Sequence, residues 1–316
     1  MKSTFAILTA GAAAANLRTV SFYESQHAAW KAEFPESVST LQAFADNTDT
    51  IEAHNAGNSS YTMGHNQFSG LTENQFRSLY LNNNFAAFDA AREKNYDMTL
   101  TEGPVKAFAK IDWVAKGAVT PVKDQAQCGS CWAFSTVAGM EGQLFVAEGK
   151  LLSMSEQDLV SCDKNGDQGC NGGLMDNAFT WIQTNGLCTE ADYPYTSGTC
   201  KKTCKAAATC TGHKDVPKGD EDALYTALTQ APVSIAVDAG KFQLYKSGIL
   251  DTTCGKQLDH GVTLVGAGTD GGKDYWTIKN SWGKTWGEKG FIRLIHGKDE
   301  CGLADSASQP TGVKSL

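Results

Sequence analysis

The sequence predicts an α+β protein in which a helical half is followed by a strand-rich half. Residues 131–149 form an apolar, helix-like run, and residues 155–160 begin at Ser155, a suitable helix N-cap. The later part of the chain instead carries short runs rich in β-branched and aromatic residues, which are typical of strands. Helices grouped before strands indicate the α+β class. The strand-like runs lie at 232–237, 261–266, 275–279 and 290–294.

The first 15 residues predict a signal peptide. Lys2 gives a positive start, and the apolar stretch from Phe5 to Ala15 ends in small residues that suit signal cleavage. No later stretch reaches the roughly 18 consecutive apolar residues of a membrane span, so we expect none. Ten cysteines in one chain agree with an oxidising, secretory route.

Residues from about 16 to 106 form a separate segment, because they contain no cysteine and are rich in Asn, Ala and charged residues. Within this segment, residues 39–55 predict a helix, since residues such as Phe44 and Ile51 fall near one stripe. The sequon that begins at Asn58 predicts N-glycosylation on a loop.

Composition restricts the class of function. The length of 316 residues suits two folding units or one large one. A net charge of −8 without a basic stripe argues against a nucleic-acid partner. The scattered Cys and His residues show no paired spacing of a zinc site. We therefore expect no metal and no cofactor.

Cys131 is the strongest candidate for a reactive group. It lies in the motif Cys-Gly-Ser-Cys-Trp (residues 128–132), at the start of the helix predicted over 131–149. The first N–H groups of a helix are unpaired, and together with the macrodipole they stabilise negative charge. We therefore expect a lowered pKa for the Cys131 thiol, which makes it a nucleophile.

A nucleophile needs a base and a group that orients the base, and the chain offers both. His260 follows Cys131 by 129 residues and Asn280 follows it by 149, at the edges of a window of roughly 130–150 residues that is typical of one class of cysteine peptidases. The nucleophile lies in the helical half and the base in the strand-rich half. We therefore expect a cleft where the halves meet, because binding sites concentrate at such interfaces.

Six segments, in this order, resemble the papain family of cysteine proteases, and its cathepsin L-like branch most closely. They span almost the whole C-terminal two-thirds of the chain. Six matches in family order make a chance resemblance implausible. The segments are 117–125, the motif around Cys131, 170–173, 192–195, the motif around His260, and 280–287.

The resemblance implies a two-domain papain-like fold behind a mostly helical inhibitory prosegment. We expect a mature peptidase over 107–316, with a helical domain at about 116–215 and a β-barrel-like domain at about 216–316. Residues 16–106 would be the inhibitory propeptide, lost at acid pH, and residues 1–15 the signal peptide. The protein would thus be a zymogen whose own propeptide is an intramolecular inhibitor.

The resemblance also implies the catalytic roles. Cys131 would attack the peptide carbonyl as a thiolate paired with the His260 imidazolium, which gives an acyl-enzyme thioester. Asn280 would orient the imidazole, and Trp282 would cover their hydrogen bond. The Gln125 side-chain amide and the Cys131 backbone N–H would stabilise the oxyanion.

The residues that bind the polypeptide substrate follow from the same resemblance. A bare glycine backbone at 172–173 would pair with an extended chain. Ser306 would form the base of the pocket for the residue two before the scissile bond, where an acid in some relatives accepts arginine. We therefore expect an apolar preference, unless the adjacent Asp305 takes that place. The expected substrate-binding residues are Gly172, Gly173, Leu174, Met175, Ala236, Leu258, Asp259, Trp282 and Ser306.

Two positions of the prosegment depart from the family pattern. Thr40 stands where the family usually has Arg, and Gly70 stands where it usually has Asp. Those charges normally help to hold the prosegment together. We therefore expect a shallower pH dependence of prosegment binding than in a Gly70→Asp variant.

The cysteine count leaves at least one thiol besides Cys131 that is free or pairs outside the chain, because nine cysteines remain. Cys210 follows a small-residue run in which strand-like packing could bury it. The resemblance implies the disulfides Cys128–Cys170, Cys162–Cys200 and Cys254–Cys301, which leave Cys188, Cys204 and Cys210. With Cys210 buried, we predict a Cys188–Cys204 disulfide, and Cys204–Cys210 is the competing pair.

Two other functions stay open at this point. Cys128 and Cys131 form a C-x-x-C pair, which suits a dithiol oxidoreductase, although the preceding stretch lacks the strand which that motif requires. A catalytically silent homologue that only binds is the second alternative. No His-His insertion lies between Gly173 and Tyr193, which favours an endopeptidase. We expect a monomer in the secretory pathway, with a lysosomal, vacuolar or extracellular destination.

Overall fold

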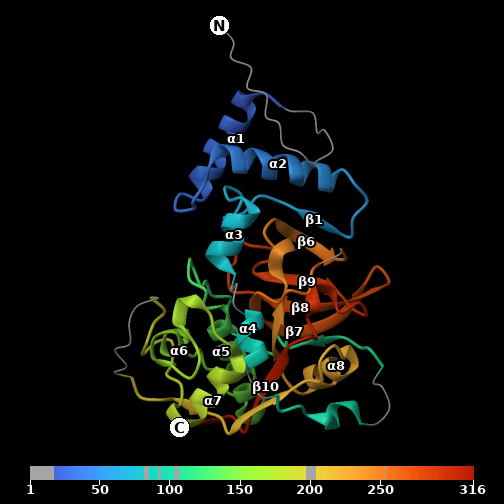
Figure 1. The fold of residues 1–316 in the computed structure, drawn as a ribbon. Coiled ribbons are helices and arrows are strands. Elements are labelled where there is room, and N and C mark those ends of the chain that lie inside the picture. Colours follow the sequence, from blue (N-terminus) through green and yellow to red (C-terminus); the bar gives the residue numbers. More distant parts are fainter. Residues whose placement is uncertain (1–17, 82–84, 92–93, 103–106, 197–203, 253) are drawn as a thin grey trace.

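The computed structural model describes residues 18–81, 85–91, 94–102, 107–196, 204–252 and 254–316. The expected signal peptide, residues 1–15, lies outside these residues. Figure 1 shows the N-terminal helices stacked above a body in which a helical half and a sheet lie side by side. In the part of the chain that the structure describes, no helix is both long and apolar enough to cross a bilayer.

The N-terminal segment begins with two helices, α1 (Val20–Glu33) and α2 (Leu41–Asn55), that pack against each other. α2 is the predicted helix, and it starts after Thr40 because the Thr40 hydroxyl accepts a hydrogen bond from an N–H in the first turn at 3.1 Å. Trp30 of α1 and Phe44 of α2 pack between the helices, with ring centroids 5.5 Å apart. These aromatic contacts stabilise the pair.

The rest of the N-terminal segment runs down the body. Strand β1 (Tyr61–Met63) pairs antiparallel with β6 (Tyr245–Leu250), so the segment adds an edge strand to the sheet. Helices α3 (Glu73–Tyr80) and α4 (Phe85–Ala91) follow, and then the 3-10 helix η1 (Met98–Thr101). In Figure 1, α4 lies over the boundary between α5 and the sheet.

The two departures from the family's charge pattern lie against each other. The Thr40 N–H donates to the Gly70 carbonyl at 3.0 Å. A Cβ at position 70 would lie 2.2 Å from the Cβ of Ser39, so an aspartate has no space there. A Gly70→Asp variant would therefore displace the 38–40 loop as well as add a charge, so its pH dependence would report both changes.

The helical half is built around α5 (Cys131–Glu148), most of whose side chains are buried. α5 ends at Gly149, whose φ of 69° is the left-handed conformation that commonly terminates helices. α6 (Glu156–Cys162) begins at the predicted cap, because the Ser155 hydroxyl accepts from the Asp158 N–H at 3.0 Å. The remaining helices are η2 (Gly169–Asn171), α7 (Met175–Asn185), α8 (Glu221–Gln230), η3 (Ala239–Lys241) and η4 (Glu300–Gly302).

The strand-rich half is one sheet in the order β1-β6-β9-β8-β7-β5-β10-β4, with β2 paired to β7. Its centre is the antiparallel pair of β7 (His260–Asp270) and β8 (Lys273–Lys279), which turns at two glycines with positive φ. The four predicted strands correspond to β5 (Val233–Val237), β7, β8 and β9 (Phe291–Ile295). The other strands are β2 (Ile111–Asp112), β3 (Ala208–Thr209), β4 (Gly212–Asp215), β10 (Ala307–Thr311) and β11 (Lys314–Ser315), with β3 and β11 paired separately.

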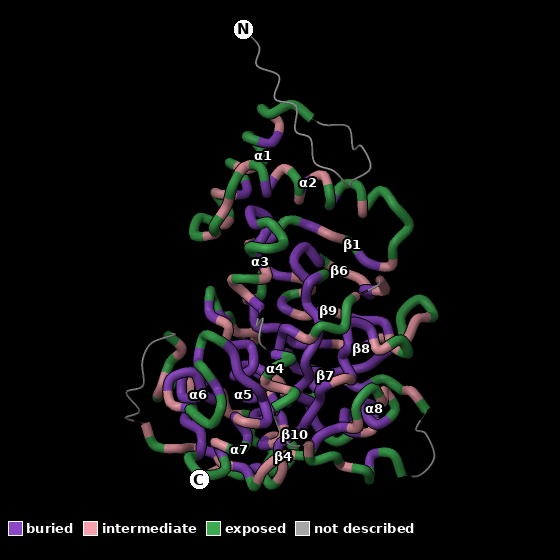
Figure 2. Tube along the Cα trace, viewed as in Figure 1, coloured by how far each residue is buried: buried purple, intermediate pink, exposed green. Residues whose placement is uncertain are grey.

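Two apolar cores flank the boundary between the halves, and the N-terminal segment contributes to both. Phe68 and Phe76 of that segment join Trp276 and Trp282 in the core of the strand-rich half. Phe85 of α4 joins the core of the helical half. Figure 2 shows the outer surfaces of α1 and α2 exposed, whereas the centre of the body is buried. The segment is therefore an integral part of the packing where it crosses the body.

Disulfides link neighbouring segments of the body, and Cys131 and Cys210 are free and buried. The predicted choice of Cys188–Cys204 over Cys204–Cys210 is confirmed. The predicted Cys162–Cys200 pair lies outside the described residues, because Cys200 does. The disulfides between described residues are Cys128–Cys170, Cys188–Cys204 and Cys254–Cys301.

A buried polar network joins the two halves behind the cleft. At the end of β8, Lys279 donates to the Thr120 hydroxyl at 2.9 Å, and that hydroxyl donates to Glu141 of α5 at 2.6 Å. Lys123 pairs with Glu156 of α6 at 2.7 Å. Each buried charge in this network thus has a partner, as the desolvation of charged groups requires. The network fixes the segments that lead to the candidate catalytic residues.

Candidate active site

Cys131 is the first residue of α5, and its side chain is fully buried. Its backbone lies directly against β7, since a Cβ built on Gly261 would be 3.2 Å from the Cys131 carbonyl carbon. This glycine therefore lets the helix that carries the thiol approach the strand that begins with His260. The structure brings these two predicted residues to the same boundary between the halves.

The imidazole of His260 is oriented by Asn280. The His260 Nε2 lies 2.8 Å from the Asn280 Oδ1, and the Ser281 N–H also donates to this oxygen at 2.8 Å. Because Oδ1 only accepts, Nε2 carries the proton and Nδ1 of the neutral ring is an acceptor. Among the described residues, Nδ1 has no hydrogen-bond partner. The Trp282 ring stacks on the imidazole at 4.5 Å, as expected for a cover over this bond.

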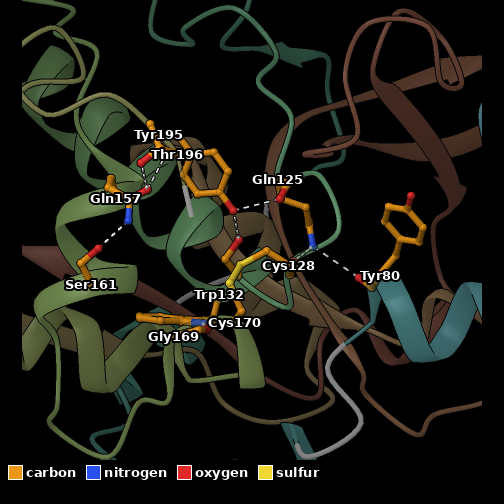
Figure 3. Close-up of a disulfide and its surroundings, with 11 residues drawn as sticks. Tyr80, Gln125, Cys128, Trp132, Gln157, Ser161, Gly169, Cys170, Tyr195 and Thr196 are labelled. Carbon is orange, nitrogen blue, oxygen red and sulfur yellow. Dashed lines mark hydrogen bonds between the residues drawn. A yellow bond between two sulfur atoms is a disulfide. The ribbon is translucent and has the colours of Figure 1, made fainter. Parts of the chain in front are cut away.

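Gln125 lies on the other side of the cleft, with its side-chain amide held at both ends. Its Nε2 donates to the Cys128 carbonyl at 2.9 Å and to the Tyr80 carbonyl at 3.3 Å. Its Oε1 accepts from the Ser281 hydroxyl at 2.6 Å. Figure 3 shows this amide between Tyr80 and Cys128, beside the Cys128–Cys170 disulfide. The Gln125 backbone carbonyl accepts from the Tyr195 hydroxyl at 2.8 Å.

The carbonyl of Tyr80 belongs to the N-terminal segment, so that segment occupies the cleft. Beyond Tyr80, Leu81 is buried and Phe85 is fully buried. Phe85 joins the cluster that contains Leu174, Met175 and Ala236, with Leu258 packed against it. Four residues of the expected substrate pocket therefore belong to the same apolar cluster as a prosegment side chain.

Ser306 faces the same part of the cleft. Its hydroxyl donates to the Asp89 carboxylate of α4 at 3.0 Å. The neighbouring Asp305 lies near the same region, since a Cβ on Gly302 would be 3.0 Å from the Leu258 Cδ2 and 3.3 Å from the Asp305 Oδ2. Among these two side chains, Ser306 is the one whose hydrogen bond to α4 is seen.

The predicted glycines 172 and 173 both need to be glycine. Gly172 has a φ of 109°, which side chains rarely adopt. A Cβ on Gly173 would lie 2.7 Å from the Trp132 ring. Both positions follow Cys170, whose disulfide to Cys128 holds them near the start of α5.

Burial changes the electrostatics that the sequence suggests. It raises the pKa of the Cys131 thiol from 9.0 to about 12, although backbone N–H groups of Gly261 and Trp132 act in the opposite direction. Burial also lowers the pKa of His260 to about 4, opposed by its bond to Asn280. The expectation of a lowered thiol pKa is therefore wrong for this state of the chain. The prosegment removes water from the cleft, and desolvation outweighs the helix N-terminus.

Several residues of this site were not predicted. Ser281 lies within the segment 280–287 and orients both Asn280 and Gln125. Tyr195 lies within the segment 192–195, and its hydroxyl contacts the Ser130 hydroxyl at 2.7 Å and the Gln125 carbonyl. Contacts between residues so distant in the chain carry no local signal, so only their presence in a matching motif could have suggested them.

Metal ligation is not favoured by the clusters of potential ligands in the described residues. Two of the three clusters contain disulfide-bonded cysteines, whose sulfur atoms are no longer thiolates. In the third, Asp215 accepts from the Asn95 N–H, and Asp176 accepts from the Ser308 hydroxyl and faces His213. These groups are engaged in internal contacts.

The fold and the site together define a latent thiol hydrolase. A buried cysteine, an oriented histidine and an amide donor meet at the boundary of two halves, and the N-terminal segment of the same chain covers them. Because Cys128 pairs with Cys170 rather than with Cys131, the C-x-x-C motif is not a dithiol pair. The oxidoreductase alternative has no support.

Comparison with known proteins identifies the family. The model for "Papain family cysteine protease" matches residues 107–311, and the one for "Cathepsin propeptide inhibitor domain (I29)" matches residues 27–76. The senescence-specific cysteine protease SAG39 of Oryza sativa subsp. japonica is 44% identical over 91% of this chain and 90% of its own length. Vignain of Ricinus communis is 44% identical over 84% of this chain and 81% of its own. The chain therefore belongs to the papain family of cysteine proteases.

Solved structures of cysteine protease zymogens are also similar to this chain. The proform of the ragweed pollen cysteine protease Amb a 11 superposes with a TM-score of 0.86 at 35% identity, covering 93% of this chain and 96% of that one. A digestive procathepsin L 3 from the larval midgut of Tenebrio molitor superposes with a TM-score of 0.80 at 36% identity, covering 92% of this chain and 99% of that one. The chain has the papain-like α+β fold, and it is a cysteine endopeptidase preceded by an inhibitory propeptide.

Proposed function

We propose that Cys131, His260 and Asn280 carry out peptide hydrolysis once the propeptide has left. His260 Nδ1 takes the Cys131 proton, and the resulting thiolate attacks the substrate carbonyl to form a tetrahedral adduct. The imidazolium then protonates the leaving amine, the C–N bond breaks, and a thioester remains. Water, deprotonated by the same imidazole, attacks the thioester and releases the acid and the thiol. The observation that supports this proposal is the His260–Asn280 bond, which leaves Nδ1 as the acceptor.

Gln125 and the Cys131 backbone N–H serve as the oxyanion donors in this proposal. The support comes from the prosegment, because the Tyr80 carbonyl takes the Gln125 N–H in the covered state. A substrate carbonyl oxygen would take the same donor and gain negative charge there. Ser281 holds the amide in the donating orientation.

Removing this donor should slow the chemistry without weakening substrate binding. We expect Gln125→Ala to lower kcat about 10²–10³-fold with little change in KM, because the bond strengthens as the oxyanion forms. Steady-state kinetics on the processed enzyme would measure this effect. Gln183→Ala is the matched control, because Gln183 is an exposed residue of α7. A normal kcat in Gln125→Ala would exclude the assigned role.

We further propose that residues 107–316 form the mature enzyme, a monomer with a helical domain at about 116–215 and a β-rich domain at about 216–316. Residues 16–106 are the propeptide that acid pH removes, and residues 1–15 direct the chain into the secretory pathway, towards a lysosome, a vacuole or the exterior. Exposure of Asn58 supports N-glycosylation there. Mass spectrometry of the acid-activated protein, alkylated without reduction, would give the new N-terminus and the free thiols together.

The expected pocket for the residue two before the scissile bond should prefer Leu, Phe or Val over Arg. Its walls are apolar, and a buried guanidinium beside Ser306 would lack a partner, which is costly. We expect kcat/KM to differ at least about tenfold, because burying one apolar side chain contributes roughly 1.5–3 kcal/mol. Fluorogenic peptides that differ only at this residue would measure the ratio. Ser306→Asp should narrow it, whereas equal wild-type rates for Arg and Leu would show a carboxylate in the pocket.

A further inference from the structure

Arg77 of the prosegment binds an acidic site on the enzyme that the catalytic roles above do not use. Its Nη1 donates to the Asp259 Oδ2 at 2.8 Å, and its Nη2 lies 3.8 Å from the Asp238 Oδ1. The guanidinium lies over Gly240, where a Cβ would be 1.7 Å from Nη2. We call Asp238, Gly240 and Asp259 the arginine cradle. A side chain at position 240 would therefore displace the Arg77 guanidinium from this place.

The arginine cradle is fixed by the enzyme itself. The Ala239 N–H donates to Asp259 at 2.8 Å, while the N–H groups of Gly240 and Gln257 donate to Asp238 at 3.2 Å each. These donors lie outside the prosegment, so the orientation of both carboxylates does not depend on Arg77. A site held in place this way loses little entropy when it binds a new cation.

In the full-length chain the cradle is covered. The side chains of Asp259 and Asp238 are only 7% and 8% exposed beneath the prosegment, where carboxylates without a partner would be costly and Arg77 supplies that partner. Burial raises the pKa of Asp259 to about 7, and Arg77 acts in the opposite direction. When the prosegment leaves, the cradle loses its guanidinium while the backbone donors stay.

The position of the cradle shows which part of a substrate would reach it. Phe85 and Asp89 of α4 mark the pocket for residues before the scissile bond. α3 ends at Tyr80 and so precedes this part of the prosegment, and its Phe76 packs on Trp282 with ring centroids 5.3 Å apart. Asp259 directly precedes His260, the residue that protonates the leaving amine. The cradle is therefore on the leaving-group side.

We propose that in the processed enzyme the arginine cradle is a subsite that selects peptides with an arginine among the first three residues after the scissile bond. This inference rests on the proposed function, since it assigns a substrate preference to the same cleft. The guanidinium of the substrate takes the place of the Arg77 guanidinium and pairs with the same two carboxylates. Arginine is preferred over lysine because its planar fork can reach both carboxylates at once.

Peptide kinetics test the preference directly. Internally quenched peptides with Leu two before the scissile bond would carry Arg or its uncharged isostere citrulline at the first, second or third position after it. We expect kcat/KM about tenfold higher for Arg than for citrulline at one of these positions. Asp238→Asn should bring that ratio close to one. Asp222→Asn, which removes an exposed charge on α8, should keep the ratio of the wild type.

Active enzyme in these assays is counted by titration with a thiol alkylator, so a partly misfolded variant does not distort the ratio. Equal kcat/KM for Arg and citrulline at all three positions in the wild type would overturn the inference. So would an unchanged ratio in Asp238→Asn.

A second measurement reports on the cradle without peptide turnover. In the full-length chain, Arg77→Gln should speed alkylation of Cys131 at least about tenfold, because α3 loses its charged anchor. The alkylation rate in Arg77→Lys should lie between the rates in Arg77→Gln and in the wild type. Unchanged alkylation in Arg77→Gln would contradict guanidinium binding by the cradle. If Arg77→Gln speeds alkylation but no peptide is cut at all, the proposed function fails while the cradle is supported.

Discussion

Replacing Cys131 with alanine should reduce peptide hydrolysis to background, a loss on the order of 10⁴-fold or more, as for other enzymes that lose their nucleophile. No described group near the start of α5 can replace the thiol in forming a thioester. Cys131→Ser should be nearly as inactive, because a hydroxyl ionises far less readily than a thiol. Hydrolysis of a fluorogenic peptide by the processed enzyme would measure the loss.

Cys210 provides the matched control, since it is the other free thiol among the described residues. It is buried under α7, where its Sγ lies 3.3 Å from the Phe179 carbonyl. Cys210→Ala should therefore keep its catalytic activity and lose only packing. Because Cys131→Ala cannot process itself, its fold should be checked by circular dichroism, and its processing should be completed by added wild-type enzyme. Substantial hydrolysis by that product would end the thiol mechanism.

The full-length chain should react with a thiol alkylator at least about 10³-fold more slowly at pH 7 than the processed enzyme. With a pKa of about 12 in the covered state, only about 10⁻⁵ of the Cys131 thiol is ionised at that pH. The His260 pKa of about 4 keeps the imidazole neutral as well. The covered pair is thus uncharged, whereas the processed pair gains water and can separate charge.

The pH dependence should differ in the same experiment. In the full-length chain the alkylation rate should rise about tenfold per pH unit up to pH 10, because the raised pKa leaves the thiolate to form only as pH approaches 12. In the processed enzyme the rate should be nearly flat around neutrality. Intact-mass spectrometry in a Cys210→Ala background counts only unprocessed chains and only Cys131. Equal rates for both forms would show that the prosegment leaves the thiol ionised.

Local sequence rules were sufficient where a single segment determines its own structure. Ser155 caps α6 and Gly149 ends α5 because capping depends on the neighbouring N–H and C=O groups. β5, β7, β8 and β9 follow from runs of β-branched and aromatic residues. β10 was missed because its sequence, Ala307–Thr311, is polar and contains a proline, although four of its five residues are buried by neighbours from distant parts of the chain.

The residues of the candidate site were predicted from the sequence, but the protonation of Cys131 and His260 in the covered site was not. Motif matches predicted that Cys131, His260, Asn280 and Gln125 share one site, and the structure places all four at the boundary between the halves. The electrostatics depended on what covers the cleft, and no residue near Cys131 encodes that. Two further contacts could not be predicted for the same reason. The lack of space for Asp at position 70 and the ion pair between Arg77 and Asp259 both depend on segments far apart in the chain.

The hydrogen bond between Ser281 and Gln125 ties catalytic activity to the contact between the two halves. Ser281 lies in the strand-rich half and Gln125 in the segment that leads into α5, so one hydrogen bond of 2.6 Å spans the seam between the halves. Lys279 and Thr120 span it again from behind. A hinge motion that parts the halves would take the base, His260, away from both the nucleophile and the amide donor, which stay together on the helical side. Separation of the halves is therefore sufficient to abolish activity, even while each half stays folded.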